Sequence, residues 1–214
     1  MEFPQLTPTQ AKGRAHLVLG RIRGQTMQVT CSKFEAASRQ LDEAIGLLLA
    51  DHDPLAVRTL AAAAFGLFAD LVEHSKPDES WRSRLIQDSG LDKKQALAVI
   101  HNAQNFLKHA DRDPDAQLSF DECENEELIF IATLDCGELG GPLTAPMQAF
   151  QIWYLALNPG KLGADHDFTL RANSAFEDLP SKSRKEQLAA GLDFLLLMLE
   201  KYGRGAHKPR GTQL

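Results

Sequence analysis

Residues 32–73 decide the fold, and they read SKFEAASRQLDEAIGLLLADHDPLAVRTLAAAAFGLFADLVE. The first half repeats apolar residues at helical spacing, which predicts a helix with one core-facing side. These residues are Phe34, Ala37, Leu41, Ile45, Leu48 and Leu49. Asp53 and Pro54 are typical of an N-cap and a first helical residue, so a second helix is expected to begin there. Its predicted inward residues are Leu55, Leu60, Ala64, Leu67, Phe68 and Leu71. Because the break is short, the two helices should form an antiparallel hairpin.

The helical pattern continues to residue 203. Further helices are predicted over 81–86, 92–110, 122–136, 144–157 and 183–202, with a polar loop over 161–182. In the 92–110 helix the expected apolar face is Ala96, Val99, Ala103, Phe106, Leu107 and Ala110. In the last helix the expected buried residues are Leu192, Leu195, Leu196 and Leu199. The sequence therefore predicts a single-domain, all-α helical bundle of six or seven helices.

The two ends of the chain differ from this pattern. Residues 1–31 alternate in short runs broken by glycine, so they form an N-terminal extension that is predicted to hold a small hairpin. Residues 204–214 are predicted to be a basic, flexible tail, so the bundle domain is expected over 32–203. The basic cluster Lys201, Arg204, Lys208 and Arg210 could contact a phosphate backbone, or it could be a solvated tail.

Composition narrows the class of protein. The 214 residues are 43% hydrophobic and 24% charged, which is typical of a globular domain and not of a disordered chain. The net charge of −6 disfavours non-specific nucleic-acid binding over the whole surface, although it allows a local basic patch. No run of ~18 apolar residues and no signal-peptide pattern is visible, so a cytoplasmic protein without a membrane partner is expected. Three cysteines without CxxC spacing predict neither a disulfide framework nor a zinc site.

A strip of polar residues lies on the helix predicted over 92–110. At about 100° per residue, Asn102, Asn105 and His109 fall within about 60° of one another, beside the apolar face. An imidazole at a helix C-terminus, with two amides to orient a substrate, is a candidate for acid–base chemistry. The alternative is a strip that only borders solvent or bonds the next loop.

The hairpin over 32–73, followed two helices later by QNFLKH at 104–109, resembles the HEPN-type helical domains. The family motif is an arginine, a polar residue, three variable residues and a histidine. The resemblance implies that His109 matches the histidine and Asn105 the polar residue, and Gln104 stands in place of the arginine. In active members, which are metal-independent ribonucleases, the arginine stabilises the scissile phosphate, the histidine is acid or base, and a dimer often completes the site.

The missing arginine changes what the resemblance implies. Glutamine cannot make a bidentate cationic contact with phosphate, so a protein without an intact catalytic motif is expected. Arg58 on the neighbouring helix is a candidate replacement cation, or else it forms a surface salt bridge.

The loop after this helix has the register of an EF-hand. Positions 1, 3, 5, 8, 9 and 12 are occupied by Asp111, Asp113, Asp115, Leu118, Ser119 and Glu122. Position 6, which requires glycine in an EF-hand, is Ala116. The loop is therefore either a calcium site or an acidic turn whose aspartates cap helices.

Three hypotheses follow. The first is a HEPN-like protein that binds RNA or a protein partner, as a possible homodimer. The second is a metal-independent ribonuclease that uses His109 with Asn102, Gln104 and Asn105. The third is a calcium-binding module that uses Asp111, Asp113, Asp115 and Glu122. The aromatic set Phe150, Trp153 and Tyr154 has core spacing, and a base-stacking platform is the alternative.

Overall fold

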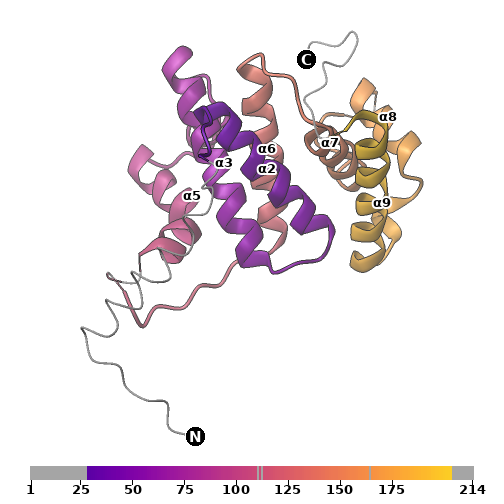
Figure 1. Cartoon of the computed structure of the whole chain (residues 1–214). Helices are drawn as coiled ribbons and strands as arrows, with labels where there is room; N and C mark the ends of the chain where they lie inside the picture. The colour runs from indigo at the N-terminus through magenta and orange to yellow at the C-terminus, as the bar shows by residue number, and fades with distance from the viewer. Residues whose placement is uncertain (1–27, 110, 112, 164, 204–214) are drawn as a thin grey trace, which may run out of the picture. The chain divides into compact units, whose positions relative to one another are not determined.

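The prediction of an all-α bundle is confirmed (Figure 1). The computed structural model describes residues 28–109, 111, 113–163 and 165–203. Within these residues it contains eight α-helices and one short 3₁₀ helix, and no strand. The elements are α2 (Lys33–Leu49), α3 (Pro54–Ser75), α4 (Trp81–Asp88), α5 (Lys93–Lys108), α6 (Cys123–Glu138), α7 (Ala145–Leu157), α8 (Asp167–Ala175), η1 (Leu179–Ser181) and α9 (Arg184–Tyr202).

The chain divides into two units, Met1–Ser32 and Lys33–Leu214, and the bundle belongs to the second. The hairpin predicted over 1–31 lies outside the described residues, except for 28–31, which form neither helix nor strand. The basic tail over 204–214 also lies outside them.

The hairpin of α2 and α3 forms as predicted. Asp53 caps α3, since its Oδ1 accepts the N–H groups of Leu55 and Ala56 at 2.8 and 3.3 Å. Asp51 adopts a left-handed conformation (φ 56°) in the turn, and the His52 N–H donates back to the Leu47 carbonyl at 3.0 Å. The two helices pack along each other, so the turn chemistry and the apolar stripes favour the same geometry.

α3 is the central helix of the core, because it packs against α2 and also against α6. Of the inward residues predicted for it, Ala64 and Phe68 are buried, whereas Leu55 is 43% exposed. A helix between two neighbours buries more than one stripe, so a second set is buried as well. It consists of Val57, Ala61, Phe65, Ala69 and Val72.

α7, α8 and α9 form the second half of the bundle (Figure 1). The Trp153 indole N–H donates to the Gln187 carbonyl at 2.8 Å, which joins α7 to the start of α9. Gly191 permits the close approach, because a Cβ there would lie 2.7 Å from a Leu49 methyl and 2.8 Å from the Trp153 ring. Ser183 and Glu186 form the predicted capping box of α9.

α8 was not predicted, because a polar loop was expected over 161–182, and it brings the number of α-helices in the described residues to eight. The helix buries only Thr169 and Ala172, and it begins at a cap supplied by the His166 side chain. Because only these two small residues are buried, the sequence of this segment shows no apolar repeat at helical spacing, and the helix was missed.

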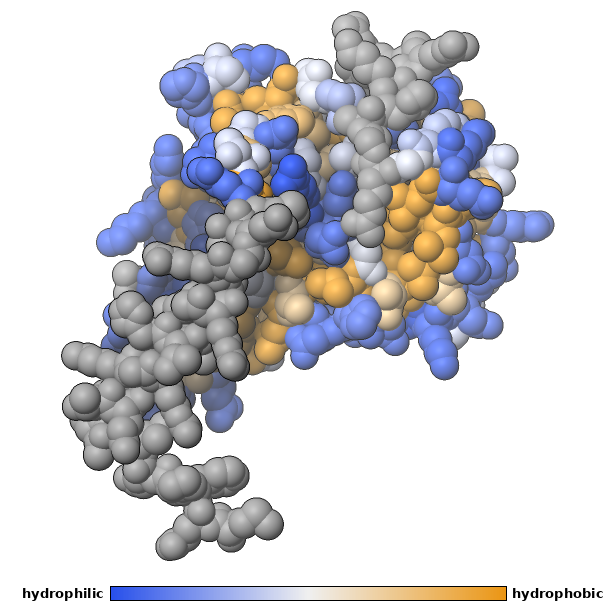
Figure 2. Space-filling model, in the orientation of Figure 1, coloured by the Kyte–Doolittle hydropathy of each residue, from blue (hydrophilic) through white to orange (hydrophobic). Residues whose placement is uncertain are grey.

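Two other expectations are wrong in detail. Val99 of α5 is 70% exposed and Leu196 of α9 is 54% exposed, although both were placed on inward faces. Each helix lies at the edge of the bundle and buries only a narrow side. In α5 this side includes Ala96 and Ala103. Figure 2 shows apolar residues at the viewed surface among polar ones.

α3 is also the one helix, within the described residues, that is long and apolar enough to cross a membrane by length and composition. Half of its most apolar window is buried inside the bundle, and its N-terminal half contains the charged Arg58. Its position between α2 and α6 accounts for this composition.

Replacing Phe68 by alanine should lower the free energy of unfolding by about 3–5 kcal/mol, because its ring is fully buried and in edge contact with Phe34. Leu55→Ala on the same helix is the control, with an expected loss below about 1 kcal/mol. Urea unfolding followed by circular dichroism measures both, and equal losses would contradict this description of the core.

Candidate functional site

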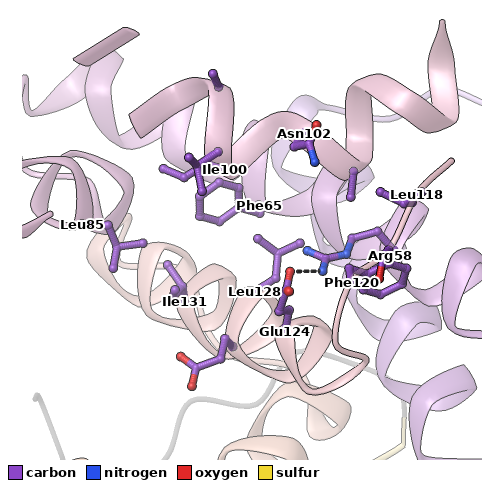
Figure 3. Close-up of a pocket in the computed structure, with 15 residues that line it drawn as sticks. Arg58, Phe65, Leu85, Ile100, Asn102, Leu118, Phe120, Glu124, Leu128 and Ile131 are labelled. Atoms are coloured by element: carbon purple, nitrogen blue, oxygen red, sulfur yellow. Dashed lines mark hydrogen bonds and ion pairs between the residues drawn. The ribbon is translucent and has the colours of Figure 1, made fainter. Parts of the chain in front are cut away.

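An open pocket of about 540 Å³ lies between α3, α5, α6 and the segment 118–120 (Figure 3). α4 adds Leu85 to its wall. This volume falls in the range of about 300–1,000 Å³ that small-molecule sites occupy. The pocket has a polar end at Arg58 and an apolar remainder, which makes it the first candidate for a binding site.

The polar end is built on a buried arginine. The side chain of Arg58 is 6% exposed, and its Nη2 donates to Glu124 Oε2 at 2.7 Å. The Phe120 ring lies against the guanidinium, with 4.6 Å between Cζ and the ring centroid. Arg58 Nε is buried and has no hydrogen-bond partner among the described residues. Figure 3 shows the ion pair beneath Asn102, next to Phe120.

Arg58 was expected to be either a replacement cation or part of a surface salt bridge, and the structure bears on the second of these. Arg58 does form a salt bridge, but its own side chain is buried and only Glu124, at 55% exposure, faces solvent. The two residues lie 66 positions apart, so sequence reasoning missed the pair. The available signal was that Arg58 has helical spacing to Ala61 and Phe65 and therefore faces inward.

The rest of the pocket is apolar. Phe65 of α3 is 1% exposed and forms its floor, while Leu85 at 38% is partly open to solvent. Ile100, Leu128 and Ile131 complete this end, and their side chains converge in Figure 3. A bound molecule could therefore bury its apolar surface away from water here, while a charged group of the same molecule lies near the Arg58 cation.

The predicted polar strip is only partly brought to the pocket. Asn102 is exposed at its mouth and is one of its lining residues. Asn105 is exposed and is not among the pocket residues. His109 is the C-cap of α5, and its Nδ1 lies 3.9 Å from Asp111 Oδ1 with 38% of the side chain exposed. Asn102, Asn105 and His109 therefore share the outer surface of α5, and only Asn102 also lines the pocket.

Gln104 lies away from this surface. It is half-buried, and its Oε1 lies 3.2 Å from Nδ1 of His101, one turn earlier. Its side chain therefore points to the flank of α5, where it contacts another residue of the same helix.

The acidic loop after α5 is exposed where the structure describes it. Asp111, Asp113 and Asp115 are all at the surface, and Glu122 is the N-cap residue of α6 without a side-chain capping bond. No group of three or more His, Cys, Asp or Glu side chains that could hold a metal ion occurs in the described part of the chain. The calcium site stays a prediction that rests on the register of the loop.

The aromatic set belongs to the core. Phe150, Trp153 and Tyr154 are each at most 1% exposed, and Tyr154 stacks on Phe130 with 4.5 Å between ring centroids. They are therefore buried as the structure stands and form no surface platform for bases.

A buried carboxylate anchors α4, and with it one wall of the pocket. The Trp81 N–H donates to Asp135 Oδ1 at 2.9 Å, while Asp135 Oδ2 is buried and has no hydrogen-bond partner in the described part of the chain. Burial raises the pKa of Asp135 to about 6, against the opposing effects of the Trp81 N–H and the guanidinium groups of Arg82 and Arg84. This carboxylate is thus costly to ionise in the folded protein.

The chain matches no family model, no curated protein and no solved structure. The fold and the site define an all-α helical bundle with a buried arginine at one end of an open pocket.

Asp135 should make stability fall as pH rises. Its folded pKa of about 6 exceeds the ordinary value of 3.8, so its stabilising effect is full below pH 3.8 and is lost as pH passes 6. Asp135→Asn keeps an acceptor for the Trp81 N–H and removes the charge. At pH 7.5 this variant should be more stable than the unmodified protein by about 1–3 kcal/mol, and near pH 4 the difference should shrink. Urea unfolding at both pH values measures it, and a variant less stable at pH 7.5 would contradict the assignment.

Proposed function

We propose that this chain is a non-catalytic, RNA-binding helical protein that contacts the phosphate backbone with the outer face of α5. The observation that supports this most directly is the charge of the helix. Its sixteen residues include three lysines and no aspartate or glutamate, on a chain of net charge −6. A local cationic surface on an acidic protein concentrates binding of a polyanion at one place.

The exposed residues of this face suit a phosphate backbone. Lys94, Asn102 and Asn105 are exposed, and at about 100° per residue they fall within about 80° of one another. Lys108 lies next to them on the helical circumference and is exposed as well. Lysine and amide side chains are common donors to phosphate and sugar oxygens.

The same face suits a protein partner less well. Interface cores are rich in aromatic residues, methionine and arginine, whereas this face carries lysines and amides, and the exposed Val99 of α5 lines the pocket instead. Asp92 caps the start of the helix, Asp111 lies beside His109 at its end, and Glu124 lines the pocket together with Asn102. A protein partner is therefore the alternative outcome of the test below.

The double variant Lys94→Glu/Lys108→Glu should weaken binding to a single-stranded oligouridine by at least about tenfold, because two phosphate contacts are lost. The slope of log affinity against log salt should fall by about 0.7 per lost contact. Fluorescence anisotropy between about 50 and 200 mM salt measures both quantities.

A matched control is available at the start of α9. Lys182→Glu/Lys185→Glu changes the net charge equally and alters two exposed lysines that lie outside α5 and outside the basic C-terminal cluster. It should leave the affinity and salt slope nearly unchanged. Equal weakening by both double variants would mean that total charge governs binding, and no binding by the unmodified protein would sink the RNA proposal and favour the protein partner.

A second candidate function is the metal-independent ribonuclease, supported by the position of His109. Its imidazole is partly exposed at the end of the same face, next to the Asp111 carboxylate. The protein itself should not cleave RNA, because Gln104 cannot stabilise a phosphate as a cation does.

Gln104→Arg is the test of this candidate, since it restores the cation of the family motif. The variant should cleave single-stranded RNA in the presence of a chelator, and Gln104→Arg/His109→Ala should not. Product analysis on denaturing gels between about pH 5 and 8 covers the range in which histidine changes charge. Absence of cleavage by Gln104→Arg throughout would remove this candidate.

A further inference from the structure

We propose that the pocket between α3, α5 and α6 binds a small amphipathic carboxylate, with the carboxylate on Arg58 in place of Glu124 and the apolar body at the Phe65 end. This site adjoins the outer face of α5 that is proposed to contact RNA, and Asn102 lies where the two surfaces meet. It would make the chain a receptor for a small molecule as well.

The first step of the argument is the state of Arg58. A guanidinium has five donors, and the described residues give this one a single hydrogen bond, to Glu124. Its Nε is buried without a partner, so hydrogen-bonding capacity remains at the polar end of the pocket. A carboxylate can accept two parallel bonds from a guanidinium, which is the strongest arrangement open to this pair.

The second step is that Glu124 can leave at low cost. Its side chain is 55% exposed, so once released it is solvated by water and does not become a buried charge. Its other oxygen accepts the Asp121 N–H at 3.2 Å, a local bond at the start of α6 that does not depend on Arg58. Exchange of Glu124 for a ligand carboxylate therefore keeps the buried guanidinium neutralised throughout.

The third step is the shape of the remaining space. From Arg58 the wall becomes apolar, through Phe65 and Leu128 to Ile131 and Leu85, in a volume of about 540 Å³. A lone inorganic anion would leave this end filled with water. A ligand with an apolar body next to its carboxylate gains from both ends of the pocket.

Asn102 adds direction at the mouth. It is exposed on α5 above the ion pair, and its amide can donate to the outer oxygen of a bound carboxylate (Figure 3). Glu127 also lines the pocket, but its carboxylate is bonded to Lys161 at 2.9 Å. The ligand therefore meets one exchangeable carboxylate, that of Glu124.

The test uses three probes at pH 7.5, measured by isothermal titration calorimetry on the full chain. Octanoate has both features, octan-1-ol lacks the charge and acetate lacks the apolar body. Octanoate should bind at least about tenfold more tightly than either of the others. Failure of octanoate to bind, or equal affinity for octanoate and octan-1-ol, would overturn the proposal.

Two variants separate the exchange from a general effect of charge. Glu124→Gln removes the competing carboxylate and should bind octanoate about 3- to 10-fold more tightly, whereas Arg58→Met should weaken it at least about tenfold and leave octan-1-ol unchanged. Glu138→Gln is the control, because Glu138 forms its ion pairs with Lys76 and Arg84 elsewhere and should leave binding unchanged. Weaker octanoate binding by Glu124→Gln would overturn the proposed exchange. This result is decisive whether or not the Arg58→Met variant folds. RNA binding is measured on the same variants, so that failure of the carboxylate-binding proposal can be distinguished from failure of the RNA-binding proposal.

Discussion

The packing of α3 between α2 and α6 is the constraint on which the rest of the bundle depends. Alanines on α3 let its neighbours approach, and Phe65 and Phe68 fill the space between the three helices. Because α3 is covered on two sides, α6 must supply apolar side chains toward it. The same packing leaves the flank of α3 near α5 less filled, and the pocket forms there.

A charge on such a helix needs a partner. Arg58 lies on the buried surface of α3, one turn from Ala61, and taking a guanidinium out of water is costly unless an opposite charge and hydrogen bonds compensate. Glu124 supplies the charge from the first turn of α6, and Phe120 covers the planar face. Phe120, which precedes α6, thus packs on Arg58 in a contact that also shapes the pocket.

α5 has two chemically different sides because it lies at the edge of the bundle. Its inner side buries Ala96 and Ala103, and Ile100 reaches into the pocket. Its outer side carries lysines and amides. One helix can therefore take part in a surface contact with a polyanion and in a pocket for a small ligand, and Asn102 lies where the two surfaces meet.

The sequence by itself determined the helices and most of their ends. Asp53, Asp92 and Ser183 act on N–H groups within a turn of themselves, so local chemistry is sufficient to place them. The stripe of α2 was also readable, because that helix has a single buried side. α8 was not, since two small buried residues carry no periodic signal.

Only the tertiary structure decided what the candidate site contains. Arg58 and Glu124 meet across 66 positions, and no periodicity within either helix shows that contact. The strip of Asn102, Asn105 and His109 was visible in the sequence, but its relation to the pocket depends on how far α5 rotates toward α3. That rotation is set by which side chains of α5 pack against the core. As a result, Val99 is exposed and Ala103 is buried.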